Sequence, residues 1–221
     1  MTVEHTAPER DDAGRDDAVG AIDPVVPLRR STIDKLLIGF GVVTTAVLLA
    51  AGGLLMWGAN FSDDYVQREL SSQNVFFPDR EALEAEGRDD LVQYAGEQVT
   101  SGQQAEAYAS YIDGHLAGIA DGKTYSEIDD RGAAEAVTEA EEAGADPAEI
   151  AELQATADQL RGQRDTLFKG ETLRGLLLSS YAWATIGTIA GIAAWVALAG
   201  AVLMAILTVA GVIHLRRLTA A

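Results

Sequence analysis

Two long stretches without a charged residue dominate this sequence. Residues 36–62 contain no Asp, Glu, Lys or Arg, and neither do residues 175–213. A helix needs about 20 apolar residues, at about 1.5 Å each, to cross about 30 Å of hydrocarbon. The first stretch therefore predicts one transmembrane helix. The second is too long for one straight span and too short for two. It predicts one span over about 187–212, with an apolar helical lead-in from Gly175 that lies outside the bilayer.

The charge of the chain is concentrated between these two stretches. The formal net charge is −18, and nearly all of it falls in the central segment. An acidic surface of this kind repels nucleic acid, whose binding requires basic contacts to phosphates, and it also repels anionic lipid headgroups. It attracts cations or a basic partner surface, although a simple solvated face explains the same composition. The chain has no cysteine, which excludes disulfides.

Basic residues flank the outer ends of both stretches. Arg29, Arg30 and Lys35 precede the first, and Arg216 and Arg217 follow the second. Because short cytoplasmic flanks are enriched in Lys and Arg, we expect both termini in the cytoplasm and the central segment outside it. The first stretch begins after a long polar segment and exceeds a signal-peptide core, so it predicts an uncleaved signal anchor in the plasma membrane.

These features predict an all-α membrane protein in which two transmembrane helices bracket an acidic, mostly helical extracytoplasmic domain. The expected order is a disordered cytoplasmic tail at 1–31, a transmembrane helix at 32–60, the acidic domain at 61–175, the lead-in with the second transmembrane helix at 176–214, and a cytoplasmic tail at 215–221.

The central segment shows the periodicity of helices and no strand pattern. Apolar residues at steps of three and four predict a helix over about 103–120, and an Ala- and Glu-rich stretch predicts another over about 127–143. Asp146 and Pro147 form a helix-start signal, and Gly170 is expected to close the helix that follows.

No constellation of residues predicts catalysis, a metal site or a cofactor. Gly122, Lys123 and Thr124 resemble the end of a phosphate-binding loop, but Ala117 occupies the position of its first glycine. The acidic residues near this turn do not have the spacing of a calcium loop. His115 is the only histidine between the two stretches, whereas a metal enzyme usually needs two or three imidazole or thiolate ligands. The sequence therefore predicts a protein that is not an enzyme.

Small residues within the spans predict close helix packing. Gly187 and Gly191 form a G-x-x-x-G step, which lets two backbones approach where lipid supplies no hydrophobic drive. Counting inward from the outer aromatic residues places Gly191 at about the depth of Gly52 and Gly53 on the first span. We therefore expect an antiparallel contact among these four helix-packing glycines.

Aromatic residues mark the outer membrane boundary. Trp57 on the first span and Tyr181 and Trp183 on the lead-in are typical of an interface belt. Trp195 is an alternative marker of this boundary, and it would shift the expected register.

Several segments resemble an uncharacterised family of actinobacterial membrane proteins with two spans. The similar segments are YAGEQV at 94–99, AYA at 107–109, GKTYSE at 122–127 and, most specifically, LFKGETLRGLLL at 167–178. The resemblance covers roughly residues 36–213. Family members often carry an aromatic ring-opening dioxygenase label. The sequence argues against that label here, because such iron sites need clustered His and carboxylate ligands. The resemblance implies no activity and no site residues.

The sequence thus favours a non-enzymatic integral membrane protein whose outer domain binds or organises a partner. Its expected partners are the lipid bilayer and a membrane or envelope protein. An accessory role in a larger complex fits this composition. Association with a second copy of the chain is left open. The alternatives are an extracytoplasmic sensor of cations or small solutes and, more distantly, a membrane-anchored hydrolase.

Overall fold

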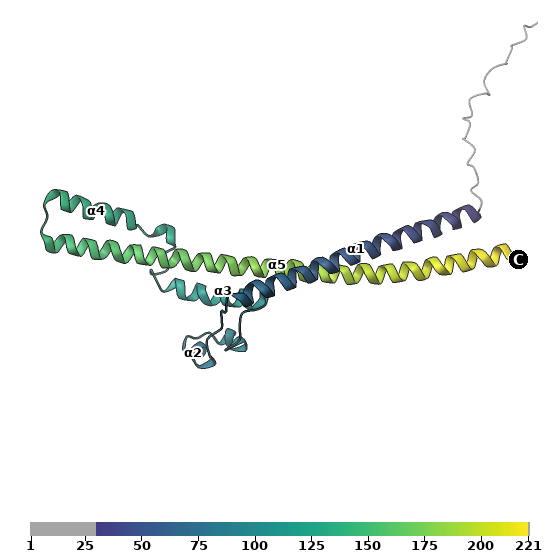
Figure 1. The fold of residues 1–221 in the computed structure, drawn as a ribbon, viewed down its shortest axis with the longest axis horizontal. Helices are drawn as coiled ribbons and strands as arrows, with labels where there is room; N and C mark the ends of the chain where they lie inside the picture. The colour runs from purple at the N-terminus through teal and green to yellow at the C-terminus, as the bar shows by residue number, and fades with distance from the viewer. Residues whose placement is uncertain (1–29, 221) are drawn as a thin grey trace, which may run out of the picture.

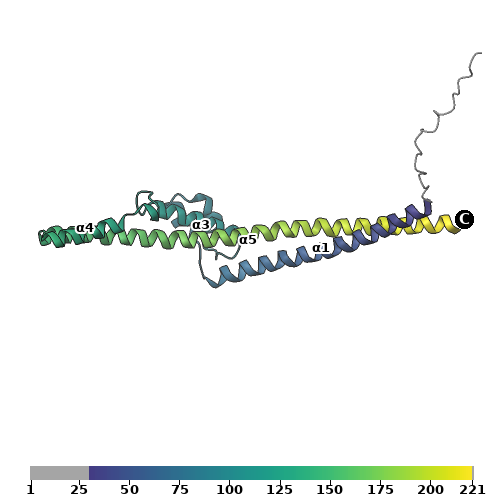
Figure 2. The same ribbon diagram turned by 90° about the horizontal axis from the view of Figure 1, so that it is seen from above.

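Two very long helices form the frame of the protein. The computed structural model describes residues 30–220, so the disordered tail predicted at 1–31 falls almost entirely outside the described residues. Helix α1 spans Arg30–Ser72 and helix α5 spans Pro147–Ala220. Helix α5 runs the length of the molecule, α1 crosses it, and the start of α1 lies at the same end as the C-terminus (Figures 1 and 2). The two helices are therefore antiparallel.

Both helices are long and apolar enough to cross a membrane. In the most apolar 18 residues of α1 and of α5, only 11% and 6% respectively are buried inside the molecule. A core helix of a soluble protein would bury most of such a stretch. Here large apolar side chains such as Leu54, Trp195 and Val196 are exposed instead. Two apolar helices thus bracket a helical middle segment, as the sequence predicts.

Helix α5 is a single uninterrupted helix of 74 residues, about 110 Å long at 1.5 Å per residue. The prediction that Gly170 closes a helix is therefore wrong. A Cβ atom at Gly170 would lie 2.9 Å from Cδ1 and 3.1 Å from Cγ of Leu116. This glycine makes room for a neighbouring helix and does not end its own. The lead-in predicted from Gly175 is helical, as expected, and it is continuous with the second apolar stretch.

Five shorter elements fill the chain between α1 and α5. They are α2 (Arg80–Ala85), the 3-10 helix η1 (Asp89–Tyr94), α3 (Gly102–Ala117), the 3-10 helix η2 (Tyr125–Glu127) and α4 (Asp130–Ala143). Helix α4 folds back along the start of α5, and α3 lies beside its middle (Figures 1 and 2). Residues 30–220 contain no strand, only one isolated antiparallel bridge between Phe76 and Gln98.

The sequence signals for helix starts act as expected. Ser101 and Gln104 form a capping box at the start of α3. Asp146 accepts a 2.8 Å hydrogen bond from the Ala148 N–H at the start of α5. Helix α3 ends at Ala117, three residues before the predicted end at Ala120, and the turn that follows uses Gly122 at φ +79°. The middle segment is thus helical because its local signals favour helix.

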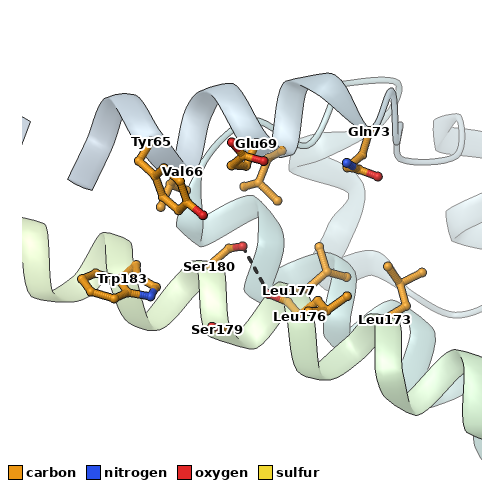
Figure 3. Close-up of a pocket in the computed structure, with 11 residues that line it drawn as sticks. Tyr65, Val66, Glu69, Gln73, Leu173, Leu176, Leu177, Ser179, Ser180 and Trp183 are labelled. Atoms are coloured by element: carbon orange, nitrogen blue, oxygen red, sulfur yellow. Dashed lines mark hydrogen bonds between the residues drawn. The ribbon is translucent and has the colours of Figure 1, made fainter. Parts of the chain in front are cut away.

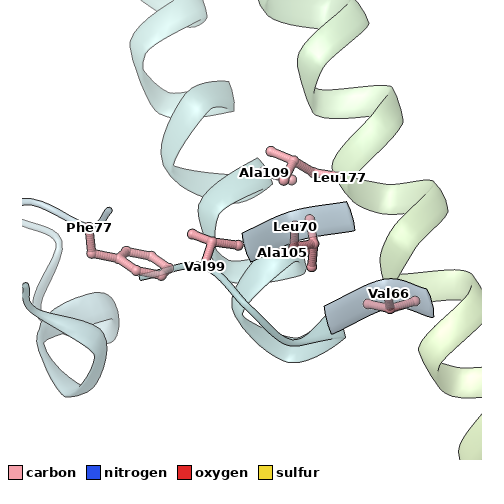
Figure 4. Packing of buried hydrophobic residues seen from close by; sticks show 7 residues of the cluster. All are labelled: Val66, Leu70, Phe77, Val99, Ala105, Ala109 and Leu177. Atoms are coloured by element: carbon pink, nitrogen blue, oxygen red, sulfur yellow. The ribbon is translucent and has the colours of Figure 1, made fainter. Parts of the chain in front are cut away.

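The apolar core consists of two small clusters along α5. One joins α1, α3 and α5 through seven buried residues: Val66, Leu70, Phe77, Val99, Ala105, Ala109 and Leu177 (Figure 4). The other is farther from the candidate spans and consists of Leu116, Ala120, Ile128 and Leu167. Because α5 contributes to both clusters, it is the element on which the middle segment is assembled.

Candidate functional site

Small residues set the contact between α1 and α5. A Cβ atom at Gly187 would lie 2.9 Å from both Cβ and Oγ of Ser62. A Cβ at Gly52 would lie 2.8 Å from Cγ of Leu198 and 3.4 Å from the carbonyl oxygen of Ala194. At these two positions the helices approach so closely that only glycine fits without movement.

The depth expected for Gly191 is wrong. Its Cβ would lie 3.6 Å from Cβ of Ala59, whereas Gly52 faces a part of α5 nearer the C-terminus. A Cβ at Gly53 would meet nothing within 4 Å, so this glycine takes no part in the contact. The depth count assumed that the outer aromatic residues of the two helices are level. Close approach of small residues sets the register instead. Ser62 is level with Trp183, so Trp57 lies nearer than Trp183 to the end of the helix pair where α1 begins.

The three residues of the predicted interface belt differ in their surroundings. Trp57 and Trp183 are 68% and 51% exposed. Tyr181 is half-buried, and its Cα lies 3.4 Å from the Cβ position of Gly102 at the start of α3. Tyr181 therefore lies where α3 packs on α5, while the two tryptophans are free to meet a surrounding solvent or lipid.

Just beyond the contact of Ser62 with α5, the two helices enclose a groove of about 350 Å³. Tyr65 and Glu69 of α1 and Gln73, just after its end, line one wall, and Leu173, Leu176, Ser180 and Trp183 of α5 line the other (Figure 3). Tyr65 and Trp183 lie toward one end of the groove, and Gln73 and Leu173 toward the other (Figure 3). Leu176 is 63% exposed. The groove is therefore an open apolar trough at the end of the candidate spans.

The sequence does not predict this groove. It predicts only an apolar helical lead-in from Gly175. The structure shows that only Leu177 of the three consecutive leucines is buried, whereas Leu176 and Leu178 are exposed. Three adjacent leucines point to three sides of a helix, because each residue turns it by about 100°. Only the positions of α1 and α3 decide which of them is covered.

The acidic residues that suggested a cation site turn toward different partners. Glu127 accepts bonds from the N–H and hydroxyl of Thr124, and Asp129 caps α4 by accepting from Gly132 N–H. Asp130 pairs with Arg164 at 2.7 Å. In the part of the chain that the structure describes, no three His, Asp or Glu side chains are placed to hold a metal ion. Helix capping and ion pairing explain this cluster.

The other candidates for chemistry have local roles. His115 lies on the exposed face of α3, with Nδ1 3.1 Å from the Tyr111 carbonyl oxygen and Nε2 3.8 Å from Glu86. Thr124, the last residue of the sequence that resembled a phosphate loop, begins the short helix η2 with Glu127 in a capping box. Neither arrangement positions a nucleophile beside a base.

The groups with shifted pKa values report the same local contacts. The hydrogen bond from Arg88 lowers the pKa of Asp90, and this pairing raises the pKa of Arg88. Burial raises the pKa of Tyr108, and burial together with the nearby carboxylate of Glu86 raises that of Tyr111. Hydrogen bonds from Thr124 lower the pKa of Glu127. Arg88 and Tyr111 line one small hollow together with Glu86 and His115, whereas Glu127 lies outside it. The shifts follow from packing, ion pairing and capping.

An ion pair joins two parts of the chain that are far apart in sequence. Arg164 of α5 reaches Asp130 at the start of α4, and its guanidinium carbon lies 5.7 Å from the centre of the Tyr125 ring. Tyr125 in turn contacts Phe168 edge-on, with ring centres 5.8 Å apart. In the sequence, Arg164 merely interrupts the apolar stripe of its helix. That interruption was the only available signal of this contact.

Comparison with protein-family models, with curated proteins and with solved structures finds no match for this chain. The helix pair, the groove and the middle segment are therefore the features that bear on its function.

Proposed function

We propose that this chain is a non-enzymatic integral membrane protein that crosses the bilayer twice and holds a partner protein at a fixed distance from the outer surface. The observation that carries the proposal is the continuity of α5, which joins the far tip of the middle segment to an apolar span without a break. From Pro147 to Trp183 the helix is roughly 55 Å long. A surface carried on such a helix keeps its distance and direction relative to the membrane.

The orientation follows from the flanking charges. Lys35 precedes the apolar part of α1, and Arg216 and Arg217 follow that of α5. Because short cytoplasmic flanks are enriched in Lys and Arg, these residues support an orientation with both termini in the cytoplasm and the middle segment outside it. Reporter fusions at the C-terminus should behave as cytoplasmic, and a fusion at Gly144, in the turn between α4 and α5, as external. A cytoplasmic signal at Gly144 would reverse the proposed orientation.

The chemistry of the middle segment supports a basic partner. The hairpin of α4 and α5 exposes carboxylates on both helices: Glu135, Glu139, Glu142, Glu149 and Glu152. Charge complementarity steers association and selects partners. A basic face of a membrane or envelope protein is the surface that would recognise this hairpin.

A break in α5 tests the proposal. Gly175 lies within the helix, and a Cβ atom there would meet nothing within 4 Å. Gly175→Pro should bend or break α5, at a cost of about 3 kcal/mol, without a clash elsewhere. Gly175→Ala is the matched control, because it keeps the helix and removes the flexibility of glycine.

The measurement is gentle purification from membranes followed by identification of co-purifying proteins. We expect a partner that elutes with increasing salt from the wild-type and Gly175→Ala proteins and is lost from Gly175→Pro. All three should remain in the membrane fraction. A partner retained by Gly175→Pro would show that the continuous helix is not needed.

A further inference from the structure

We propose that the groove between the outer end of α1 and α5 takes up one acyl chain of a bilayer phospholipid with a zwitterionic headgroup. The chain would be drawn partly out of the outer leaflet. This inference rests on the proposed function, because it requires the two helices to cross a bilayer.

The two helices change from apolar to polar at different levels. The Ser62 hydroxyl contacts the Trp183 carbonyl oxygen, so these two residues lie at the same height. Immediately after Ser62, α1 carries the exposed carboxylates Asp63 and Asp64, which cannot enter hydrocarbon without a large cost. Helix α5 has no charged residue until Arg174. The hydrocarbon must therefore end near Ser62, while α5 stays apolar beyond it.

The leucines of the groove stand above that boundary. Leu176 and Leu173 lie roughly two to three helical turns beyond Trp183, or about 10–15 Å. Both are exposed in the groove wall. Without an occupant these side chains would meet water at a level that the bilayer does not reach, which is unfavourable by about 25 cal/mol per Å² of apolar surface. An apolar occupant removes that cost.

The volume of the groove fits a single chain. It measures about 350 Å³, near the lower end of the range of roughly 300–1,000 Å³ found for small-molecule sites. One turn of a helix about 10 Å across and 5.4 Å long occupies roughly 420 Å³. A partner helix would thus fill the groove with less than one turn, whereas an acyl chain is narrow and can lie along it.

An apolar path connects the groove to the surface that a bilayer would cover. Trp57, Phe61 and Tyr65 form a stacked row along α1, with successive ring centres 5.7 and 6.2 Å apart. Ile186 lies one turn below Trp183 on α5 and is also exposed. The row ends at Tyr65, which lines the groove (Figure 3). A lipid chain can therefore enter sideways from the leaflet without crossing a polar surface.

The charges at the groove select the headgroup. Glu69 is the only carboxylate in the lining, and no basic side chain lines it. Arg68 lies near the end of the groove that Tyr65 lines, with its guanidinium carbon 6.0 Å from the centre of the Tyr65 ring. A headgroup with one phosphate and one ammonium group can meet Arg68 and Glu69 together. A purely anionic headgroup could pair with Arg68, but it would leave Glu69 without a counterion, and the carboxylates Asp63 and Asp64 just before Tyr65 would repel it.

The test uses the full chain in phosphatidylcholine vesicles that contain a photoactivatable phosphatidylcholine with a diazirine in one acyl chain. After irradiation and trypsin digestion, mass spectrometry locates the label. Peptides 36–68 and 175–216 contain the spans and report membrane insertion. Peptides 69–80 and 170–174 lie beyond the proposed hydrocarbon and contain Leu70, Gln73 and Leu173. We expect label in all four, and in peptide 69–80 at Leu70 or Gln73.

Variants test whether the groove is the cause of labelling in peptide 69–80. Leu173→Asp combined with Leu176→Asp places two carboxylates in the apolar wall and should lower labelling of peptide 69–80 by about tenfold. Leu178→Asp is the control, because Leu178 is at the same height, is 37% exposed and does not line the groove. It should leave this labelling unchanged. A probe with a phosphatidylglycerol headgroup should label peptide 69–80 several-fold less than the phosphatidylcholine probe.

The outcomes separate the two proposals. Label confined to residues before Tyr65 in peptide 36–68 and after Trp183 in peptide 175–216 would overturn the groove inference and leave the spans intact. No label in those two peptides would overturn the membrane proposal as well. Label at Phe76 alone, or an equal loss in Leu178→Asp, would mean that the domain merely touches the membrane surface. Equal labelling by the anionic probe would overturn the choice of headgroup.

Discussion

The Ser62 hydroxyl donates a 2.7 Å hydrogen bond to the main-chain carbonyl oxygen of Trp183. Ser62 is buried, and the same side chain occupies the space left by the missing Cβ of Gly187, one turn further along α5. This polar contact between residues far apart in sequence lies at the point where the helix pair meets the middle segment. It fixes the height of α1 relative to α5 and hence the position of the groove above it.

Gly187→Leu should separate the helix pair at this point. Its side chain would overlap Ser62, and overpacking of this kind costs about 1–3 kcal/mol. We expect faster cleavage of the middle segment by protease in detergent. Gly53→Leu is the matched control, since a Cβ there meets open space. Equal protease resistance in the Gly187→Leu and wild-type proteins would contradict the close contact.

The register of the pair can be tested by disulfide formation, because the chain has no cysteine of its own. The Cβ position of Gly191 lies 3.6 Å from Cβ of Ala59, within the roughly 3.5–4.5 Å that a disulfide requires. The double variant Ala59→Cys with Gly191→Cys should therefore form an intramolecular disulfide on mild oxidation, seen as a gel shift. Gly53→Cys with Gly191→Cys should not. Cross-linking of the second pair alone would restore the register expected from the sequence.

Asp130→Asn should loosen α4 from α5. The Asp130–Arg164 side chains are 16% and 31% exposed, so their ion pair is better shielded from water than a surface pair. Its loss should cost about 1–2 kcal/mol and speed amide hydrogen exchange in α4. Asp158→Asn breaks an ion pair with Arg161 whose two side chains are 68% and 63% exposed. Such a pair contributes little, so this control should leave exchange in α4 unchanged. Similar exchange in both variants would show that the shielded pair does not hold α4.

Lowering the pH should release the cap at Glu127. Two hydrogen bonds from Thr124, both 2.7 Å, stabilise the carboxylate and lower the pKa of Glu127. A group whose pKa is lower in the folded state contributes stability above its unfolded pKa, about 4.3 for Glu. That contribution is lost as the pH falls through the lower, folded value. The Thr124 amide shift in an NMR titration should therefore change with a midpoint below about 4.3.

Glu127→Gln is the control for this titration. It cannot ionise, so the step in the Thr124 amide shift should disappear. A midpoint at or above the ordinary Glu value in the wild-type protein would argue against the cap.

The sequence by itself determined the elements whose cause is local. Two charge-free stretches are long enough for two apolar helices, and Asp146 and Ser101 each begin a helix by accepting a main-chain N–H. The continuation of α1 past residue 60 to Ser72 also has a local signal, because Val66 and Leu70 keep the helical spacing of four residues. Composition and hydrogen bonding over a few residues are sufficient for these features.

The tertiary structure alone decided what each small or charged residue faces. Gly170 reads as a helix end in sequence, yet in the fold it makes room for Leu116. The acidic residues near Asp130 read as a cluster, yet they turn to separate caps and ion pairs. Gly191 meets Ala59 because close packing around Ser62 sets the register. The groove exists because two helices with different polar boundaries lie side by side. A local pattern cannot encode such contacts, because they depend on atoms brought together from distant parts of the chain.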